Sequence, residues 1–414
     1  MPTHASLLGD PAPVGVGAAN GEEQRGPPGM MGRRGVVTTH LTVAAAWMVS
    51  LMVVSGHAQG PAPAARPQST SPLTGASTGE EVYRTSCLAC HGPDGAGTPR
   101  TIVGFDVALP DFTDCAFASA EADVDWQAVV HQGGRIRGLD RHMPAFGDAL
   151  NADQIAAVVG YVRHFCADDG WPRGDLNFPR AMFTEKAFPE NEVVYTSTVT
   201  RGGEPSAGNE VVYERRFGVR NQFEAVVPVD ATRADGHWTA GIGDVAVAFR
   251  RTLIARPRSG TIAASGVEVA FPTGDADRGL GNGHHIVEPF AMVGQALPRN
   301  AFVQFHGGLE VPSDAAKGRK EAYLRSAIGF TYMADRGFGR SWSPQLEVLL
   351  ARPFGGEAEW DVVPQLQVSL SKIQHVVVAG GVRIPLNGQG ERHPAVVTYL
   401  LWDWFDGPFT SFWK

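Results

Sequence analysis

The sequence predicts a chain of two domains, a small all-α domain over residues 78–170 and an antiparallel β-barrel of the transmembrane type over residues 191–414. Three observations predict this fold class. The chain has 414 residues, too many for one small domain. Apolar residues recur at helical spacing up to about residue 165. Beyond a turn-rich connector at residues 171–190 the period changes to two, and glycine-rich turns separate the segments.

The N-terminal region carries an export signal followed by a linker. Two arginines precede an apolar run at residues 36–54, and Ala58 follows it as a small residue, which predicts a secretory signal peptide within residues 1–58. An uncleaved membrane anchor is the alternative, because the run approaches the length of a membrane span. The Gly/Pro-rich part before Met30 is unlike a signal peptide, and a start at Met30 would give a conventional one. Residues 59–77, rich in Pro, Ala and Ser, predict a flexible linker.

One motif in the helical domain points to specific chemistry, Cys87-Leu88-Ala89-Cys90-His91. Two thiols separated by two residues and followed by an imidazole have the spacing that attaches one c-type haem covalently, with the imidazole as an axial ligand of the iron. A zinc ribbon would need a second pair of ligands, and the other two cysteines stand alone. A thioredoxin-like redox pair would need a βαβ context. We therefore predict one covalently bound haem c.

The second axial ligand is predicted to be Met143, the only methionine of the helical domain. Pro144 follows it and keeps it off a helix, so its thioether can point at a buried haem face. His131, His142 and His164 remain open as alternatives. Thioether ligation would raise the reduction potential relative to two imidazoles.

These residues together resemble a class I monohaem cytochrome c. The positions that match that family are Gly79, Tyr83, Cys87, Cys90, His91, Met143, Pro144 and Tyr161. The resemblance implies a first helix crossed by a last helix, which here opens at Asn151, and a proline carbonyl, here Pro110, that holds the proximal imidazole. Cys115 and Cys166 depart from the family pattern. Because an exported fold favours pairing of its thiols, we predict a disulfide between them.

The predicted strands of the C-terminal domain alternate strictly. In one of them Val245, Val247 and Phe249 alternate with smaller or polar residues, and about 12 such segments follow one another. A soluble sandwich or propeller would alternate as well, with shorter strands. The second face of the segments suits a filled polar lumen, because it carries charges of both signs: Glu214, Arg216, Arg220, Glu224, Arg250, Glu268, Arg325, Glu347 and Arg383.

The C-terminal domain resembles a family of roughly 12-stranded outer-membrane proteins described as putative transporters. The resemblance rests on the segments 241–244 and 381–386 and on the last strand, in which Val396, Leu400, Trp402 and Trp404 share one face. The chain ends on Trp413-Lys414, whereas such barrels usually end on the aromatic residue itself. The fusion of a haem domain to a barrel is analogous in architecture to outer-membrane cytochrome–porin fusions.

Composition and motifs limit the function. The formal net charge of -8 does not suggest nucleic acid binding, and we find no catalytic triad, paired carboxylates or phosphate loop, so we expect no enzyme activity. We predict a one-electron carrier at the periplasmic side of, or across, the outer membrane, with its haem domain in the periplasm. Its partners would be outer membrane lipid and a redox protein or an extracellular electron donor. The alternative is a passive porin or transporter barrel with an accessory cytochrome domain.

Overall fold

The computed structural model describes residues 78–403 except residues 204, 235, 335–338, 372–373 and 389–391. The predicted signal peptide and linker, and the C-terminal end from Trp404, lie outside the described residues. The helices and 3-10 turns of the first domain are α2 Gly79–Ser86, α3 Leu88–His91, α4 Arg100–Val103, α5 Cys115–Ala118, α6 Asp123–Gln132, η1 Gly134–Arg137, α7 Ala152–Val162 and η2 Arg163–Phe165. Among the described residues, no helix has both the length and the apolar character needed to cross a membrane.

The remaining elements are mostly strands. They are η3 Gly174–Leu176, β1 Glu192–Thr200, β2 Ser206–Phe217, β3 Asn221–Ala234, β4 His237–Ile242, β5 Ala246–Arg256, η4 Pro257–Ser259, β6 Thr261–Ala270, η5 Ala276–Arg278, β7 Ile286–Leu297, β8 Ala301–Pro312, β9 Glu321–Phe330, β10 Tyr332–Met333, β11 Ser341–Pro353, β12 Glu359–Ser369, β13 Val376–Pro385 and β14 Ala395–Asp403. The change from helices to strands falls between residues 176 and 192.

The first and last α-helices of the helical domain, α2 and α7, cross at a glycine of α2. Capping boxes open both of them, with Thr78 as the N-cap of α2 and Asn151 as the N-cap of α7. At the crossing a Cβ atom on Gly79 would lie 2.1 Å from the carbonyl oxygen of Ala157, so only glycine fits. The rings of Tyr83 and Tyr161 pack beside it with centroids 5.3 Å apart. The crossing of first and last helix that the family resemblance implies is present.

This crossing predicts a contrast between two glycines. Gly79→Ala should destabilise the helical domain by about 1–3 kcal/mol, because the added methyl group collides with backbone that cannot move away alone. Gly160 lies on α7, where an added Cβ would meet nothing within 4 Å, so Gly160→Ala should stabilise the helix by roughly 0.5–1 kcal/mol. Thermal unfolding followed by haem absorbance measures both. Equal midpoints for the two variants would contradict the close approach.

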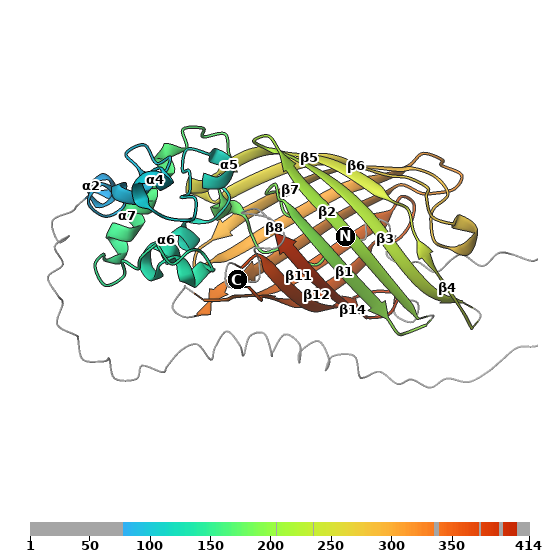
Figure 1. Ribbon diagram of the computed structural model, residues 1–414. Helices are drawn as coiled ribbons and strands as arrows, with labels where there is room; N and C mark the ends of the chain where they lie inside the picture. The colour runs from blue at the N-terminus through green and yellow to red at the C-terminus, as the bar shows by residue number, and fades with distance from the viewer. Residues whose placement is uncertain are drawn as a thin grey trace, which may run out of the picture. The chain divides into compact units, whose positions relative to one another are not determined.

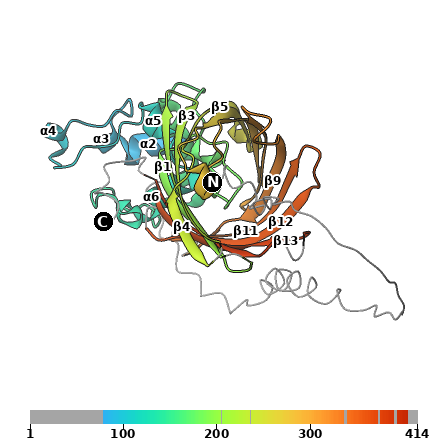
Figure 2. The same cartoon turned by 90° about the vertical axis from the view of Figure 1, so that its right-hand side faces the viewer.

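Twelve strands close into one antiparallel barrel within the described part of the chain (Figures 1 and 2). Each strand pairs with the next along the ring, from β1 through β2, β3 and β5 to β9 and on to β11 through β14. The ring closes where Glu192 of β1 pairs with Asp403 of β14. The short strands β4 and β10 pair antiparallel with the end of β3 and the start of β11. The predicted fold class and the number of strands are confirmed.

The alternation read from the sequence separates an outer and an inner face. In β5 the side chains of Ala246, Ala248 and Arg250 are buried inside, whereas Phe249 is exposed outside. In β14 Val396 and Leu400 are likewise exposed. The inner face is less uniformly polar than the sequence predicted. It contains an apolar layer that includes Val194, Val212, Val226, Val363, Val377 and Val397.

Candidate haem site and occupied barrel lumen

The two cysteines of the motif lie one helical turn apart. Cys87 is the N-cap of α3, and the backbone N–H groups of Cys90 and His91 donate to its carbonyl oxygen at 3.1 and 2.9 Å. Both thiols are half-buried and unbonded. Burial, and the neighbouring thiol of Cys90, raise the pKa of Cys87 to about 11. The short helix therefore holds two free thiols and one imidazole together.

The imidazole of His91 is half-buried, and its environment favours the neutral form. Its ring stacks on Phe112 with centroids 4.8 Å apart. Burial lowers the pKa of His91 to about 4, and a neutral imidazole is the form that binds iron. Its Nδ1 atom has no hydrogen-bond partner among the described residues. The hydrogen bond to the carbonyl of Pro110 that the family resemblance implies is thus not formed here, which leaves a buried polar atom of the motif unsatisfied.

Two glycines that the sequence analysis did not single out position Met143. Its carbonyl oxygen accepts a hydrogen bond from the N–H of Gly134 at 3.0 Å, and its side chain is half-buried. Gly133 has a φ of 80°, and a Cβ on it would lie 2.9 Å from the same carbonyl oxygen. A Cβ on Gly134 would lie 2.2 Å from the carbonyl oxygen of Asp140. The loop after η1 therefore packs tightly against the end of α6.

The three histidines left open as alternative ligands already bind protein groups. His142 contacts a carboxylate oxygen of Asp140 through Nδ1 at 2.6 Å and stacks on Phe105. His131 contacts the side-chain amide of Gln132 at 3.0 Å, and Nδ1 of His164 lies 2.7 Å from the carbonyl oxygen of Gly160. In His142 and His164 the contact uses Nδ1 and leaves Nε2, so these contacts do not decide between the histidines and Met143.

The structure joins Cys115 and Cys166 in a disulfide bond. Cys115 begins the short helix α5, which the side chain of Asp114 caps. Arg163 reinforces the same region and was missed from the sequence. Its guanidinium group lies over the ring of Trp126 at 4.1 Å and its Nε atom bonds Asp123 at 2.9 Å.

The barrel lumen is occupied by part of the predicted connector. We name residues 177–190 the plug segment, which precedes β1. Every residue from Arg180 to Glu190 is buried, although this stretch has neither helix nor strand. Its apolar side chains pack on inner-face residues of the strands: Met182 and Phe183 join the valine layer, and Phe178 and Phe188 pack among Ile262, Phe290, Met292 and Phe302. The sequence showed turn signals here and no sign of burial.

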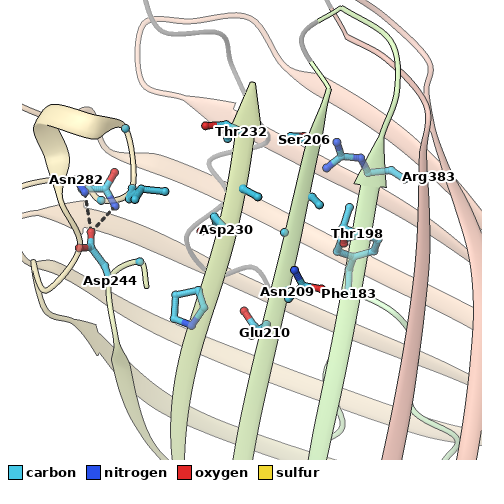
Figure 3. A pocket seen from close by; sticks show the side chains of 18 residues that line it. Phe183, Thr198, Ser206, Asn209, Glu210, Asp230, Thr232, Asp244, Asn282 and Arg383 are labelled. Atoms are coloured by element: carbon cyan, nitrogen blue, oxygen red, sulfur yellow. Dashed lines mark hydrogen bonds between the residues drawn. The ribbon is translucent and has the colours of Figure 1, made fainter. Parts of the chain in front are cut away.

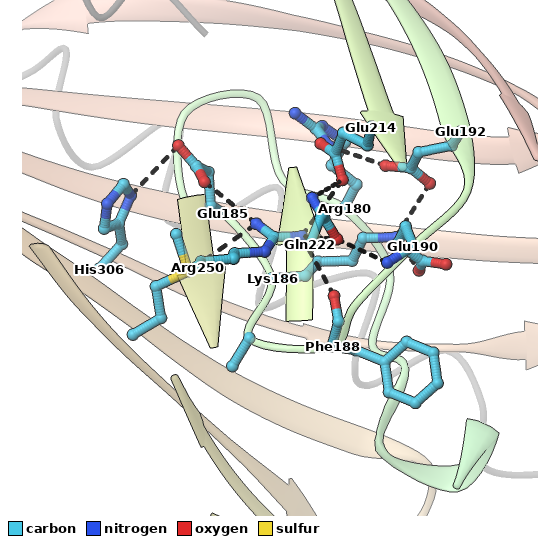
Figure 4. A network of polar contacts seen from close by, with 12 residues as sticks. Arg180, Glu185, Lys186, Phe188, Glu190, Glu192, Glu214, Gln222, Arg250 and His306 are labelled. Atoms are coloured by element: carbon cyan, nitrogen blue, oxygen red, sulfur yellow. Dashed lines mark hydrogen bonds and ion pairs between the residues drawn. The ribbon is translucent and has the colours of Figure 1, made fainter. Parts of the chain in front are cut away.

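Charged groups of the plug segment pair with the strands (Figure 4). Arg180 binds Glu192 and Glu214, both at 2.7 Å. Lys186 binds Glu190 at 2.6 Å and Glu192 at 3.2 Å. Arg250, on β5, binds Glu214 and Glu185, both at 3.2 Å. Glu214 and Arg250 of the predicted inward-facing charges belong to this network, which holds the plug segment in place. Arg220 does not, because it lies in the turn between β2 and β3, where its guanidinium group donates to the carbonyl oxygens of Gly170 and Leu253.

A second anchor is a carboxylate surrounded by backbone amides. Glu347 of β11 accepts hydrogen bonds from the N–H groups of Met182, Phe183 and Thr184 at 2.7–3.2 Å. The hydroxyl group of Thr184 also donates to it at 2.7 Å. Charge-assisted bonds of this kind are stronger than neutral ones. The tip of the plug segment is therefore bound to the wall opposite β2 and β5.

Beyond Phe183 a cavity of about 190 Å³ remains in the lumen (Figure 3). Glu210 and Asp230 on β2 and β3, Asp244, and Arg383 on β13 line it. Asp244 is bound by the backbone and side-chain N–H groups of Asn282 at 2.7 and 3.0 Å. Among the described residues no group of three or more His, Cys, Asp or Glu side chains could hold a metal ion.

Comparison with protein families identifies the helical part. Residues 74–162 match the family described as cytochrome C oxidase, cbb3-type, subunit III. These residues form a cytochrome c domain. A cytochrome c domain binds haem and suggests electron transfer. The match includes the two motif cysteines, His91 and Met143.

Solved structures show similarities to outer-membrane channels. The KdgM porin has 10% sequence identity and a TM-score of 0.35, covering 51% of this chain and 98% of the porin. The outer membrane channel from Pseudomonas putida F1 has 13% identity and a TM-score of 0.38, covering 54% of this chain and 98% of the channel. A search of curated proteins finds none that matches this chain. The barrel itself is established by the strand register.

Proposed function

We propose that this protein is a membrane-anchored c-type cytochrome that transfers single electrons at the periplasmic side of the outer membrane. One haem would be attached through Cys87 and Cys90 and ligated by His91 and Met143. The observation that carries the proposal is the short helix α3, which presents two unbonded thiols beside a half-buried neutral imidazole whose buried Nδ1 atom is unsatisfied.

The residues of this site fit a covalent haem. Bound haem iron supplies a reversible change of one charge without making or breaking bonds. Cys87 and Cys90 would tether the group, His91 would ligate the iron from one side, and Phe112 would keep the imidazole in its plane. Met143 would close the opposite side through the loop that Gly133 and Gly134 position. With His91 and Met143 both as ligands, the iron would carry electrons and bind no substrate.

The outer surface of the barrel supports membrane residence. Large apolar side chains are exposed on strands all round the ring, including Tyr195, Val211, Phe223, Phe249, Val267, Val293, Phe305, Ile328, Trp342, Trp360, Val382 and Leu400. A soluble protein rarely exposes so continuous an apolar surface. The strands are 9–14 residues long around the ring, which suits a bilayer.

The lengths of the connections between strands support a periplasmic position of the cytochrome domain. An even number of strands brings the start of β1 and the end of β14 to the same end of the barrel, which we name the N-terminal rim. The connections at this rim include the short turns 218–220, 257–260 and 298–300, whereas the opposite, far rim has loops as long as 271–285. Bacterial outer-membrane barrels have their short turns in the periplasm. The cytochrome domain, which precedes β1, would then lie in the periplasm.

The occupied lumen favours electron transfer over a passive porin. A porin needs a continuous water-filled path, whereas here the plug segment binds strands on several sides of the lumen. A redox protein or an extracellular electron donor would be the partner of the haem domain.

Membrane fractionation with haem staining tests the proposal. We expect a haem-stained band in the outer membrane fraction that survives denaturing electrophoresis. A haem-stained band in the soluble fraction would contradict the membrane assignment, and a membrane band without stain would contradict covalent haem.

Met143 has a ligand test of its own. Met143→Ala should let the reduced protein bind carbon monoxide at neutral pH, because one axial position opens. Met143→His should instead lower the midpoint potential, because an imidazole replaces a thioether. Optical titration measures both. His131→Ala is the matched control and should change neither property. Carbon monoxide binding by the unsubstituted protein would contradict Met143 ligation.

A further inference from the structure

Five exposed arginines lie on the outer surface near the N-terminal rim. We name them the arginine rim: Arg215, Arg251, Arg256, Arg258 and Arg299. They belong to β2, to β5, and to the turns after β5 and β7. The three turns 218–220, 257–260 and 298–300 contain no aspartate or glutamate. The exposed charge of these turns and of the strand ends beside them is therefore of one sign. Two exposed carboxylates of the preceding chain, Asp168 and Asp169, lie next to Gly170, whose carbonyl oxygen accepts a hydrogen bond from Arg220 of the first turn at 2.6 Å.

The far rim differs in this respect. Its connections mix both signs, with Asp275, Asp277 and Arg278 in one loop and Asp314, Lys317 and Arg319 in another. Along the described chain, the single-sign charge is thus a property of the N-terminal rim between β2 and β8.

The arginine rim lies at the edge of the apolar surface. Arg215 pairs across the sheet with Phe223, which pairs with Phe249, and both phenylalanines are exposed. Arg251 lies two residues beyond Phe249 on the same outward face. Its guanidinium group donates to the side-chain oxygen of Asn221 at 2.8 Å. Arginines and aromatic rings therefore alternate on neighbouring strands.

Within the described residues, none of the five arginines forms an ion pair. An arginine on the lipid face is strongly unfavourable at the bilayer midplane and close to neutral near the interface. The arginine rim is therefore expected at the level of the lipid headgroups. Phosphodiester oxygens are the anions at that level, and guanidinium groups bind them with charge-assisted, two-pronged hydrogen bonds.

We propose that the arginine rim binds the phosphodiester headgroups of anionic phospholipids in the adjacent leaflet. This inference rests on the proposed membrane residence of the barrel. Continuity with the apolar surface favours a lipid over an acidic protein, because one molecule can then cover both the aromatic rings and the arginines.

The test uses the full-length protein in detergent, titrated with phosphatidylglycerol or phosphatidylcholine and analysed by native mass spectrometry. The rim variant is R215Q/R251Q/R258Q/R299Q. The matched control removes four exposed arginines, three from the far rim and Arg352 from the end of β11, as R233Q/R278Q/R319Q/R352Q. We expect the rim variant to bind phosphatidylglycerol at least about tenfold more weakly, since one surface arginine contributes on the order of fivefold. Binding of phosphatidylcholine should not change, and the control should resemble the unsubstituted protein.

Three results would overturn the proposal. The first is a phosphatidylglycerol affinity of the rim variant equal to that of the unsubstituted protein. The second is a loss of affinity in the control variant as large as in the rim variant. The third is displacement of the lipid by inorganic phosphate at the same concentration as the lipid, which would indicate a site for free anions. An acidic protein displaced from the rim variant with lipid affinity intact would assign the surface to a protein partner. If the unsubstituted protein fails to insert into vesicles, the proposed membrane residence is wrong as well. If it inserts normally but binds lipids regardless of headgroup, only the proposed role of the arginine rim is wrong.

Discussion

Replacing Cys87 and Cys90 together by alanine is expected to abolish covalently bound haem. Both thiols lie one turn apart on α3 and are unbonded, so each is available for one thioether link. Haem staining after denaturing electrophoresis should fall to background, while an antibody still detects the full-length chain. Electron transfer by the purified protein should be lost with the stain.

Leu88→Ala is the matched control, because Leu88 lies between the two thiols and is partly exposed. It should keep the stain. A stain that persists in the cysteine double variant would contradict attachment at this motif. If the leucine variant loses the stain to the same extent, the loss comes from disruption of helix α3. The loss in the double variant could then not be assigned to the two thiols.

Replacing residues 179–189 by glycine and serine at constant length is expected to open the barrel. The substitution removes Arg180, Lys186 and the apolar side chains of Met182, Phe183 and Phe188, while leaving the wall of strands unchanged. Glu192 would lose both of its cationic partners, Arg180 and Lys186, and an uncompensated buried charge costs about 3–5 kcal/mol, which favours entry of water. Single-channel conductance in planar bilayers should rise at least about tenfold, since a closed lumen becomes a polar pore.

The control replaces residues 313–320, a largely exposed connection at the far rim, in the same way. Its conductance should equal that of the unsubstituted protein. If the unsubstituted protein conducts as well as the plug variant, the plug segment does not close the lumen and the passive porin becomes the better explanation.

Local patterns predicted much of the helical domain. Asn151 as an N-cap and the apolar stripe of α7 depend only on neighbours within a few residues, and both are present. The alternation of the strands, their number and the outward face of Val396 and Leu400 also followed from period two. These features can be predicted because the backbone of a helix or a strand repeats with a fixed period along the chain.

The positioning residues were harder to predict. Gly133 and Gly134 matter because backbone from the Met143 loop approaches them from outside their own helix. The partners of Arg163 lie about 40 residues away along the chain, as for Asp123. No spacing rule along the chain connects a residue to a partner so far away, so the sequence could not identify these three residues as positioning residues.

The sequence settled that this chain contains a haem-attachment motif and a set of alternating strands, because both depend on short, repeating spacings. The tertiary structure alone decided what fills the barrel. The plug segment has no periodicity, and its burial depends on Glu192, Glu214, Arg250 and Glu347, which four separate strands contribute. Closing the ring brings these groups together around one short stretch of chain, and only then can its charges and amides be satisfied without water.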